Sequence, residues 1–126
     1  ASDVYKRQIQ VFGDGTQRRD YNFIDDVIDA LLLVALSDNA DGKAYNLGSP
    51  NPLSLEETAK LMCKQVEGGN YELIPFPENR KAIDVGDFIC DFTTFSDSFG
   101  WVPKVSFADG ITKSIEFFER EISHYL

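Results

Sequence analysis

The sequence of 126 residues has little of what metal sites and membrane spans require. It holds two cysteines, Cys63 and Cys90, and one histidine, His124, which stands far from both. Zinc sites and redox pairs need such residues at close spacing. We therefore predict two buried free thiols, and a solvated terminal His124 that shuttles no proton. No apolar run reaches the roughly 18 residues of a membrane span, and no secretory signal is evident, which predicts a cytoplasmic protein without a membrane partner.

Positive charge is also scarce. The chain carries 12 Lys and Arg against 21 Asp and Glu, a net charge of −9 at pH 7. Such a surface repels nucleic acid and anionic membranes at long range, which argues against both as partners. A phosphate-bearing ligand would have to be held by local geometry, because the overall field opposes it.

The first eight residues look foreign to the rest of the chain. The run Asp3-Val4-Tyr5-Lys6-Arg7-Gln8 resembles a translated sequencing adapter, and processing scars concentrate at termini. We expect residues 1–8 to be such an artefact and the protein itself to occupy 9–126. A genuine basic N-terminal strand is the alternative.

The apolar content of 43% suffices for one small core.

The most informative segment is 11–21, Val-Phe-Gly-Asp-Gly-Thr-Gln-Arg-Arg-Asp-Tyr, where a short apolar strand leads through glycines to two arginines. Gly13 and Gly15 can adopt positive φ and let backbone amides approach a ligand, and the arginine fork matches phosphate oxygens. The alternative is a β-hairpin turn, because Asp14-Gly15 is a favoured hairpin dipeptide. A calcium loop beginning at Asp14 is rejected, since Arg18 would stand at its fifth position.

Hydrophobic periodicity and turn residues divide the rest of the chain into alternating strands and helices. The predicted strands are 9–12, 43–47 and 71–76, and the predicted helices are 24–36, 54–66, 94–99 and 106–124. Ser54 and Glu57 have the spacing of a capping box at the start of the second helix. Trp101 is expected to anchor the last helix to the core.

The first predicted helix is amphipathic and begins with acidic residues. Asp25, Asp26 and Asp29 lie where the helix dipole favours carboxylates, which is a sufficient structural reason for them. The side chains expected to face inward are Val27, Ile28, Leu31, Leu32, Ala35 and Leu36.

Six features follow one another in an order that indicates a known family. They are the Gly-Asp-Gly-x-Gln-x-Arg-Asp-aromatic run at 13–21, Phe-Ile-Asp-Asp-Val at 23–27, Ala-Tyr-Asn-Leu-Gly at 44–48, an arginine near Pro77, Asp91 with Gly-Trp-Val-Pro at 100–103, and the helix entry at 105–111. In this order the chain resembles an extended short-chain dehydrogenase/reductase. More narrowly, it resembles the C-terminal part of an NAD-dependent nucleotide-sugar epimerase or dehydratase.

The resemblance implies an α/β fold in two pieces. Residues 24–48 would belong to the edge of a Rossmann sheet that binds the dinucleotide, and the later elements would form the small α/β substrate-binding lobe. The remainder of that sheet would be missing. We therefore expect apolar surface to be exposed, especially around Leu31–Val34, and the isolated chain to aggregate or stay molten.

The resemblance also suggests a site for a nucleotide-diphosphate sugar. Phe12 would lie beside the base, and Arg19 and Arg80 would face a common hollow and clamp the diphosphate. Asp84 would bond the ribose, although four positions separate it from Arg80 where relatives show three, which leaves Asp87 as a rival. These five positions are expectations from the family pattern.

Two further residues accompany that site. Gln17 belongs to the family run and would support the loop by bonding its backbone, or contact the substrate. Arg18 is expected to be solvated, because only its neighbour matches the pattern.

The implied activity of the parent protein is transient hydride transfer from the sugar to NAD and back, with a UDP-glucose 4-epimerase-like reaction as first choice and a 4,6-dehydratase reaction next. The parent would be a homodimer. This chain has neither a Tyr-x-x-x-Lys pair nor the glycine-rich turn that binds a dinucleotide, so the fragment alone is expected to be inactive. A non-catalytic nucleotide-sugar-binding regulator is the alternative.

Overall fold

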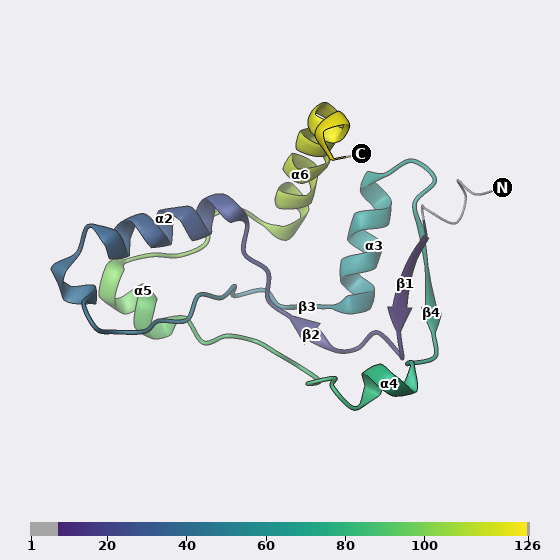
Figure 1. Cartoon of the computed structure of the whole chain (residues 1–126), viewed down its shortest axis with the longest axis horizontal. Helices are drawn as coiled ribbons and strands as arrows, with labels where there is room; N and C mark the ends of the chain where they lie inside the picture. The colour runs from purple at the N-terminus through teal and green to yellow at the C-terminus, as the bar shows by residue number, and fades with distance from the viewer. Residues whose placement is uncertain (1–7, 126) are drawn as a thin grey trace.

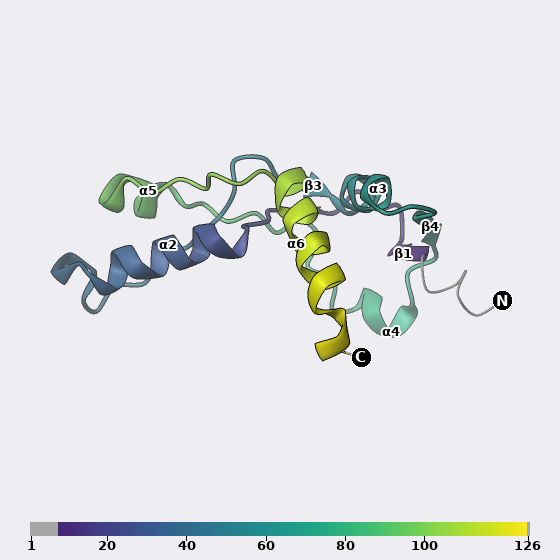
Figure 2. The ribbon, with the colours of Figure 1, turned by 90° about the horizontal axis from the view of Figure 1, so that it is seen from above.

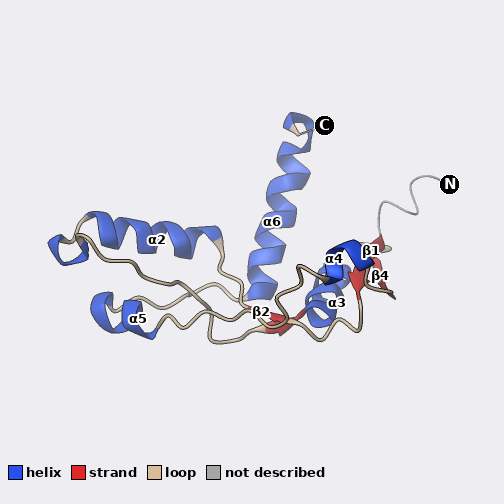
Figure 3. Cartoon of the chain, turned by 60° about the horizontal axis from the view of Figure 1, so that its bottom comes forward, coloured by secondary structure: helices blue, strands red, loops and turns tan. Residues whose placement is uncertain are grey.

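The structure, a computed structural model, describes residues 8–125. The predicted adapter segment therefore lies outside the described residues, except for Gln8, which begins the first strand. The chain is elongated: two helices gather at one end, two parallel strands and a helix at the other, and long connections join them (Figure 1; Figure 3). Figure 2 shows the same two ends from above, with the last helix leaving the body between them.

The sheet end consists of β1 (Gln8–Phe12), β4 (Asn70–Ile74) and α3 (Leu55–Gln65). The two strands pair in parallel with Val11 opposite Leu73, and α3 contacts both. The strands predicted from the sequence at this end are confirmed.

A second, smaller sheet lies between the two ends. Its strands β2 (Arg18–Arg19) and β3 (Leu53–Ser54) are antiparallel. Because β1 pairs with β4 and β2 pairs with β3, the glycine turn between β1 and β2 joins two different sheets. The hairpin alternative for this turn is therefore wrong.

Helix α3 begins with the predicted capping box. The Ser54 hydroxyl accepts a hydrogen bond from the Glu57 backbone N–H at 3.1 Å, and the Glu57 carboxylate accepts one from the Ser54 N–H at 2.8 Å. This reciprocal pair satisfies two of the donors that a helix start leaves free. A four-residue helix, α4 (Glu78–Lys81), follows β4 and was not predicted.

The helical end consists of α2 (Ile24–Ala35) and α5 (Thr93–Phe99). Its core is formed by the buried side chains of Ala30, Phe95 and Trp101. The partly buried residues packed against this core are Val34, Tyr45, Leu47, Phe92 and Phe99. The edge-to-face contacts of Phe95 with Trp101, with ring centroids 5.5 Å apart, are typical of aromatic cores. Trp101 is a core residue as predicted, but the core that it joins is the one formed by α2 and α5.

Asp26 joins α2 to the segment that leads into the last helix. Its carboxylate is buried and accepts hydrogen bonds from the backbone N–H groups of Lys104 and Val105, both at 3.0 Å. Its carbonyl accepts the indole N–H of Trp101, also at 3.0 Å. The helix dipole was therefore an incomplete explanation, because Asp26 also satisfies backbone donors from a distant segment.

The inward face predicted for α2 is wrong for this chain. Of the residues expected inside, only Val27 is half-buried, and the exposed ones are Ile28, Leu31, Leu32, Ala35 and Leu36. The packed side of the helix carries Asp26, Ala30 and Val34 instead. The physical reason is that α2 is apolar on two sides, and α5 with Trp101 covers only one. The exposure expected around Leu31–Val34 is confirmed for its leucines, whereas Val34 packs against the core.

The strand predicted at 43–47 is absent. The segment carries no strand assignment and no ladder pairing, although Tyr45 packs its ring against Phe95 and Phe99. A strand needs a neighbour to pair with, and no described residue supplies one. The contribution of 24–48 to a nucleotide-binding sheet stays a prediction.

The last helix, α6 (Phe107–Glu121), begins at the N-cap Ser106 as predicted and continues into a short 3-10 turn at Ile122–His124. In residues 8–125, no helix is both long and apolar enough to span a bilayer.

The two cysteines differ from the prediction. Cys63 and Cys90 are free thiols, but they are half-buried and not fully buried. Burial raises the pKa of the Cys63 thiol.

Candidate functional site

The glycine turn after β1 is held in place by its own residues. Gly13 and Gly15 adopt φ of 73° and 69°, the left-handed region that the sequence predicts. The Asp14 carboxylate accepts hydrogen bonds from the Thr16 hydroxyl at 2.7 Å and the Thr16 N–H at 3.0 Å, and both lower the pKa of Asp14. A Cβ on Gly15 would meet the Glu56 Cβ at 3.0 Å, so the turn lies directly against α3.

A cavity of about 240 Å³ opens beside this turn, between β1 and α3. It brings together three of the predicted site residues, Phe12, Gln17 and Asp84, from three separate segments of the chain. The other lining residues are mostly apolar: Ile9, Gln10, Val11, Leu55, Thr58, Ala59, Met62 and Phe76. An apolar cavity with a few convergent polar groups is the usual form of a small-molecule site.

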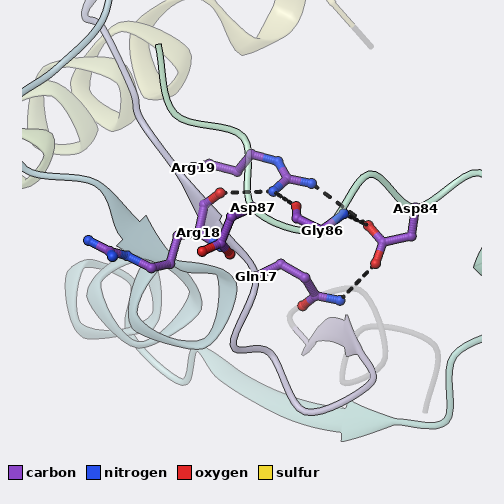
Figure 4. A network of polar contacts seen from close by, with 6 residues as sticks. All are labelled: Gln17, Arg18, Arg19, Asp84, Gly86 and Asp87. Atoms are coloured by element: carbon purple, nitrogen blue, oxygen red, sulfur yellow. Dashed lines mark hydrogen bonds and ion pairs between the residues drawn. The ribbon is translucent and has the colours of Figure 1, made fainter. Parts of the chain in front are cut away.

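Polar contacts join Gln17, Arg19 and Asp84 at one edge of the cavity, and Figure 4 shows the Gln17 and Arg19 side chains directed toward Asp84. The Gln17 amide donates to the Asp84 carboxylate at 3.3 Å, and the Arg19 guanidinium lies 3.9 Å from its other oxygen. The Gln17 side chain thus bonds Asp84 and not its own backbone. Its Oε1 is buried and has no partner in the described residues.

Arg19 is also held by backbone carbonyls. Its Nη1 donates to the carbonyl of Gly86 and, at 2.8 Å, to that of Arg18. The guanidinium side chain is only 25% exposed. These contacts fix the orientation of Arg19 while its Nη2 reaches toward Asp84.

Arg18 and Asp87 have structural tasks. Asp87 accepts the Arg18 backbone N–H at 2.7 Å, and Phe88 donates its N–H to the Arg18 carbonyl at 3.0 Å. The Arg18 side chain is exposed and points away from Asp84, as predicted (Figure 4). Asp87 therefore docks the loop onto β2, and Asp84 is the carboxylate at the cavity.

The sequence did not predict the contact of Asp20 with Cys90 and Gly48, which helps to hold the loop after α4 in place. The Asp20 carboxylate accepts the Cys90 N–H at 3.1 Å. A Cβ on Gly48 would come within 2.7 Å of both the Asp20 carboxylate and the Cys90 carbonyl. Asp20 and Gly48 both stood in the family motifs, but only three-dimensional proximity shows that one packs against the other.

Arg80 lies on α4 and contacts the site from outside. Its guanidinium is 5.5 Å from the centroid of the Phe12 ring, which also packs against Phe76 at 5.7 Å. Neither Arg19 nor Arg80 lines the cavity, but each contacts a residue that does. Their joint grip on a diphosphate stays a prediction.

Comparison with known proteins places these observations in a family. A family model described as GDP-mannose 4,6 dehydratase matches residues 2–114. The UDP-glucose 4-epimerase of Mycolicibacterium smegmatis is 32% identical over 115 residues, which cover 91% of this chain and 36% of that protein. The chain therefore spans about a third of the length of this relative.

Two solved structures share the fold. The UDP-glucose 4-epimerase of Thermotoga maritima, solved with UDP-glucose, is 28% identical with a TM-score of 0.76, over 94% of this chain and 37% of that one. The dTDP-glucose 4,6-dehydratase of Bacillus anthracis, solved with NAD, is 19% identical with a TM-score of 0.76, over 97% of this chain and 38% of that one. The chain belongs to the GDP-mannose 4,6 dehydratase family and has the fold of one part of an extended short-chain dehydrogenase/reductase.

Proposed function

We propose that this chain is the nucleotide-sugar-binding portion of an NAD-dependent nucleotide-sugar 4-epimerase or 4,6-dehydratase, with a UDP-glucose 4-epimerase as first choice. The observation that carries the proposal is the convergence of Phe12, Gln17 and Asp84 on one cavity, with Arg19 and Arg80 at its edge. The epimerase relative in Mycolicibacterium smegmatis supports the first choice.

In this proposal the cavity takes one part of the ligand. Its volume of about 240 Å³ is below the roughly 300–1,000 Å³ of complete small-molecule pockets. The ring of Phe12 packs beside the base, and Asp84 accepts a ribose hydroxyl. The rest of the ligand extends toward the arginines.

Arg19 is suited to the diphosphate because its guanidinium is already oriented by two carbonyls. Its long contact with Asp84, at 3.9 Å, is a weak ion pair that phosphate oxygens can replace. A charge-assisted contact of this kind contributes about 1.5–3 kcal/mol. Arg80 would supply a second contact by swinging from the face of Phe12.

The hydride chemistry belongs to the parent protein and its NAD. The dehydratase of the same fold was solved with NAD. Because this sequence holds no Tyr-x-x-x-Lys pair and no glycine-rich dinucleotide turn, the 126 residues alone would bind the sugar nucleotide without turning it over. The parent is also proposed to be a cytoplasmic homodimer.

The second candidate is a non-catalytic regulator that keeps the nucleotide-sugar site. Its nucleotide-sugar site would be the same cavity at Phe12, Gln17 and Asp84, so ligand binding alone fits both candidates. The upstream reading frame of the parent gene distinguishes the two. A Tyr-x-x-x-Lys pair encoded there would support an enzyme part, whereas an upstream part of the same fold without that pair would support the regulator.

Isothermal titration with UDP tests the site itself. Arg19→Ala should weaken UDP binding about 10- to 100-fold, because it removes a charge-assisted contact to phosphate. Arg18→Ala is the matched control, since this adjacent arginine points away from Asp84, and it should change binding less than about twofold. Equal weakening by the two substitutions would contradict the proposal.

A further inference from the structure

Asp20 directly follows Arg19, and its carboxylate bonds the same loop that carries Asp84. The carboxylate accepts the Cys90 backbone N–H at 3.1 Å, from a residue 70 positions further along the chain. Both Asp20 and Cys90 are half-buried. Because hydrogen bonds to a charged acceptor are stronger than those between neutral groups, this contact can hold the loop in place.

The loop lies alongside β2 up to this contact. Arg19 and Phe88 form a parallel bridge, and the Phe88 N–H donates to the Arg18 carbonyl at 3.0 Å. The bond from Cys90 to Asp20 extends this pairing beyond the end of β2. From there both segments continue toward the helical end of the molecule (Figure 1).

The loop in turn orients the guanidinium of Arg19. Nη1 of Arg19 donates to the Gly86 carbonyl, and Nη2 lies 3.9 Å from the Asp84 carboxylate (Figure 4). The Gly86 N–H donates to the same carboxylate at 3.3 Å. A side chain that is oriented before its ligand arrives loses less conformational entropy on binding. The contact at Cys90 can therefore influence the candidate site through the loop.

Gly48 permits the contact because it has no side chain. A Cβ at this position would come within 2.7 Å of both the Asp20 carboxylate and the Cys90 carbonyl, so one of the two would have to move. Gly48 does not belong to the glycines with positive φ. The close approach of three segments, and not an unusual backbone conformation, is thus the reason for a glycine here.

We propose that Asp20 is a positioning residue of the nucleotide-sugar site. It fixes the loop at 84–90, and through the Gly86 carbonyl this loop fixes the guanidinium of Arg19. Asp20 itself does not touch the ligand, because its carboxylate would repel a diphosphate. The effect on ligand affinity rests on the proposed function, whereas the effect on the orientation of Arg19 does not.

An NMR titration with UDP measures the effect on affinity. Asp20→Ala should weaken UDP binding about five- to tenfold, because Arg19 loses its fixed orientation. Asp20→Asn keeps an oxygen that accepts the Cys90 N–H and should change binding less than about twofold. Asp91→Ala is the matched control with the same small effect, since Asp91 lies on the same segment but bonds the nearby Thr93 N–H. Equal weakening by all three substitutions would overturn the proposal.

The same substitution in an Arg19→Ala background separates positioning from a general loss of stability. If Asp20 acts through Arg19, Asp20→Ala should weaken binding less than about twofold further in this background. A full five- to tenfold further loss would overturn the proposal. Gly48→Ala leaves Asp20 in place but forces the contact apart, so it should reproduce both results. Unchanged UDP binding in Gly48→Ala would also overturn it.

The guanidinium NMR signals of Arg19 test the proposal without a ligand. The two Nη groups should give separate signals in the unchanged chain, because the carbonyls that hold Nη1 hinder rotation. These signals should merge in Asp20→Ala and stay separate in Asp20→Asn, with the exposed Arg18 as the reference for free rotation. Separate Arg19 signals in Asp20→Ala, or merged ones in the unchanged chain, would overturn the proposal. The expected pattern in a chain that binds no UDP would count only against the proposed function.

Discussion

The sheet end and the helical end of this chain are stabilised in different ways. At the sheet end, polar groups close to one another in sequence satisfy each other, as in the Asp14 turn and the Ser54–Glu57 capping box. At the helical end, stability depends on residues far apart in sequence, such as Asp26 with Lys104 and Ala30 with Phe95. The sheet end combines these local contacts with the long-range pairing of β1 and β4, whereas the helical end packs one side of α2 and leaves the other exposed.

The two ends therefore differ in how much of their structure follows from short-range sequence signals and how much depends on distant segments. A capping box or a positive-φ glycine acts within a few residues, so the start of α3 and the glycine turn form from local sequence signals. The exposed side chains of Ile24, Ile28, Leu31 and Ala35 form one face of α2, here called its outer face. This face and segment 43–47 are apolar, but in residues 8–125 nothing covers the first and no strand pairs with the second. The candidate cavity lies at the sheet end.

The largest expected effect is at the core of the helical end. Phe95→Ala should cost about 3–5 kcal/mol, because its ring is almost fully buried against Trp101 and Phe99. Leu31→Ala removes an exposed side chain and should change stability by less than about 0.5 kcal/mol. Amide hydrogen exchange in α2 and α5 measures both. A similar loss of protection in the two variants would show that the outer face of α2 is covered within this chain.

The next effect concerns the buried carboxylate that joins α2 to the last helix. Asp26→Ala should cost about 2–4 kcal/mol, since two backbone N–H groups lose a charged acceptor. Asp25→Ala is the control, because Asp25 is exposed in the same helical turn and contributes only about 0.3–1 kcal/mol through the helix dipole. Urea unfolding monitored by Trp101 fluorescence compares them. If Asp25→Ala were as costly, the dipole alone would explain both carboxylates.

The smallest effect is a pH dependence at the sheet end. Hydrogen bonds from the Ser54 backbone and hydroxyl lower the pKa of Glu57 from its ordinary value of 4.5. A carboxyl with a lowered folded-state pKa stabilises the fold above its unfolded pKa and loses that contribution as the pH falls through the folded value. The first turn of α3 should therefore lose hydrogen-exchange protection below about pH 4.5.

Glu57→Gln is the control for this pH dependence, because the amide keeps an acceptor for the Ser54 N–H but does not titrate. The variant should lose less protection in the first turn of α3 as the pH falls. An unchanged acid response in Glu57→Gln would assign the effect to other groups, among them Glu56, whose pKa is lowered by Lys60 and Tyr71.

The elements that could be predicted from the sequence are those whose sequence signals lie within a few residues of one another. The start of α3 and the positive-φ turn fall in this class, as does the anchoring Trp101, whose Gly-Trp-x-Pro setting predicts a packed ring. Segment 43–47 was wrongly predicted as a strand, because its apolar residues Tyr45 and Leu47 pack against the helical-end core and no described residue pairs with it. Leu31, Leu32 and Leu36 of α2 were wrongly predicted to face inward, because α5 and Trp101 cover only the side with Ala30.

The candidate site was predictable in composition but not in arrangement. The family pattern names Phe12, Gln17 and Asp84, and these residues do meet at one cavity. The sequence could not show that Gln17 bonds Asp84, or that Asp87 is taken by the Arg18 backbone. Both contacts join residues more than sixty positions apart, and no local signal encodes that distance.

The most direct test of the account is a backbone amide NMR titration of the chain with UDP. Saturable shifts are expected at the cavity and its edge, namely Phe12, the glycine turn at 13–17, Arg80 and the loop at 84–88, with α2 unaffected. In Arg19→Ala the same shifts should need about 10- to 100-fold more UDP to saturate. Shifts centred elsewhere, or shifts that persist unchanged in Arg19→Ala, would contradict the assignment of this cavity to a sugar nucleotide.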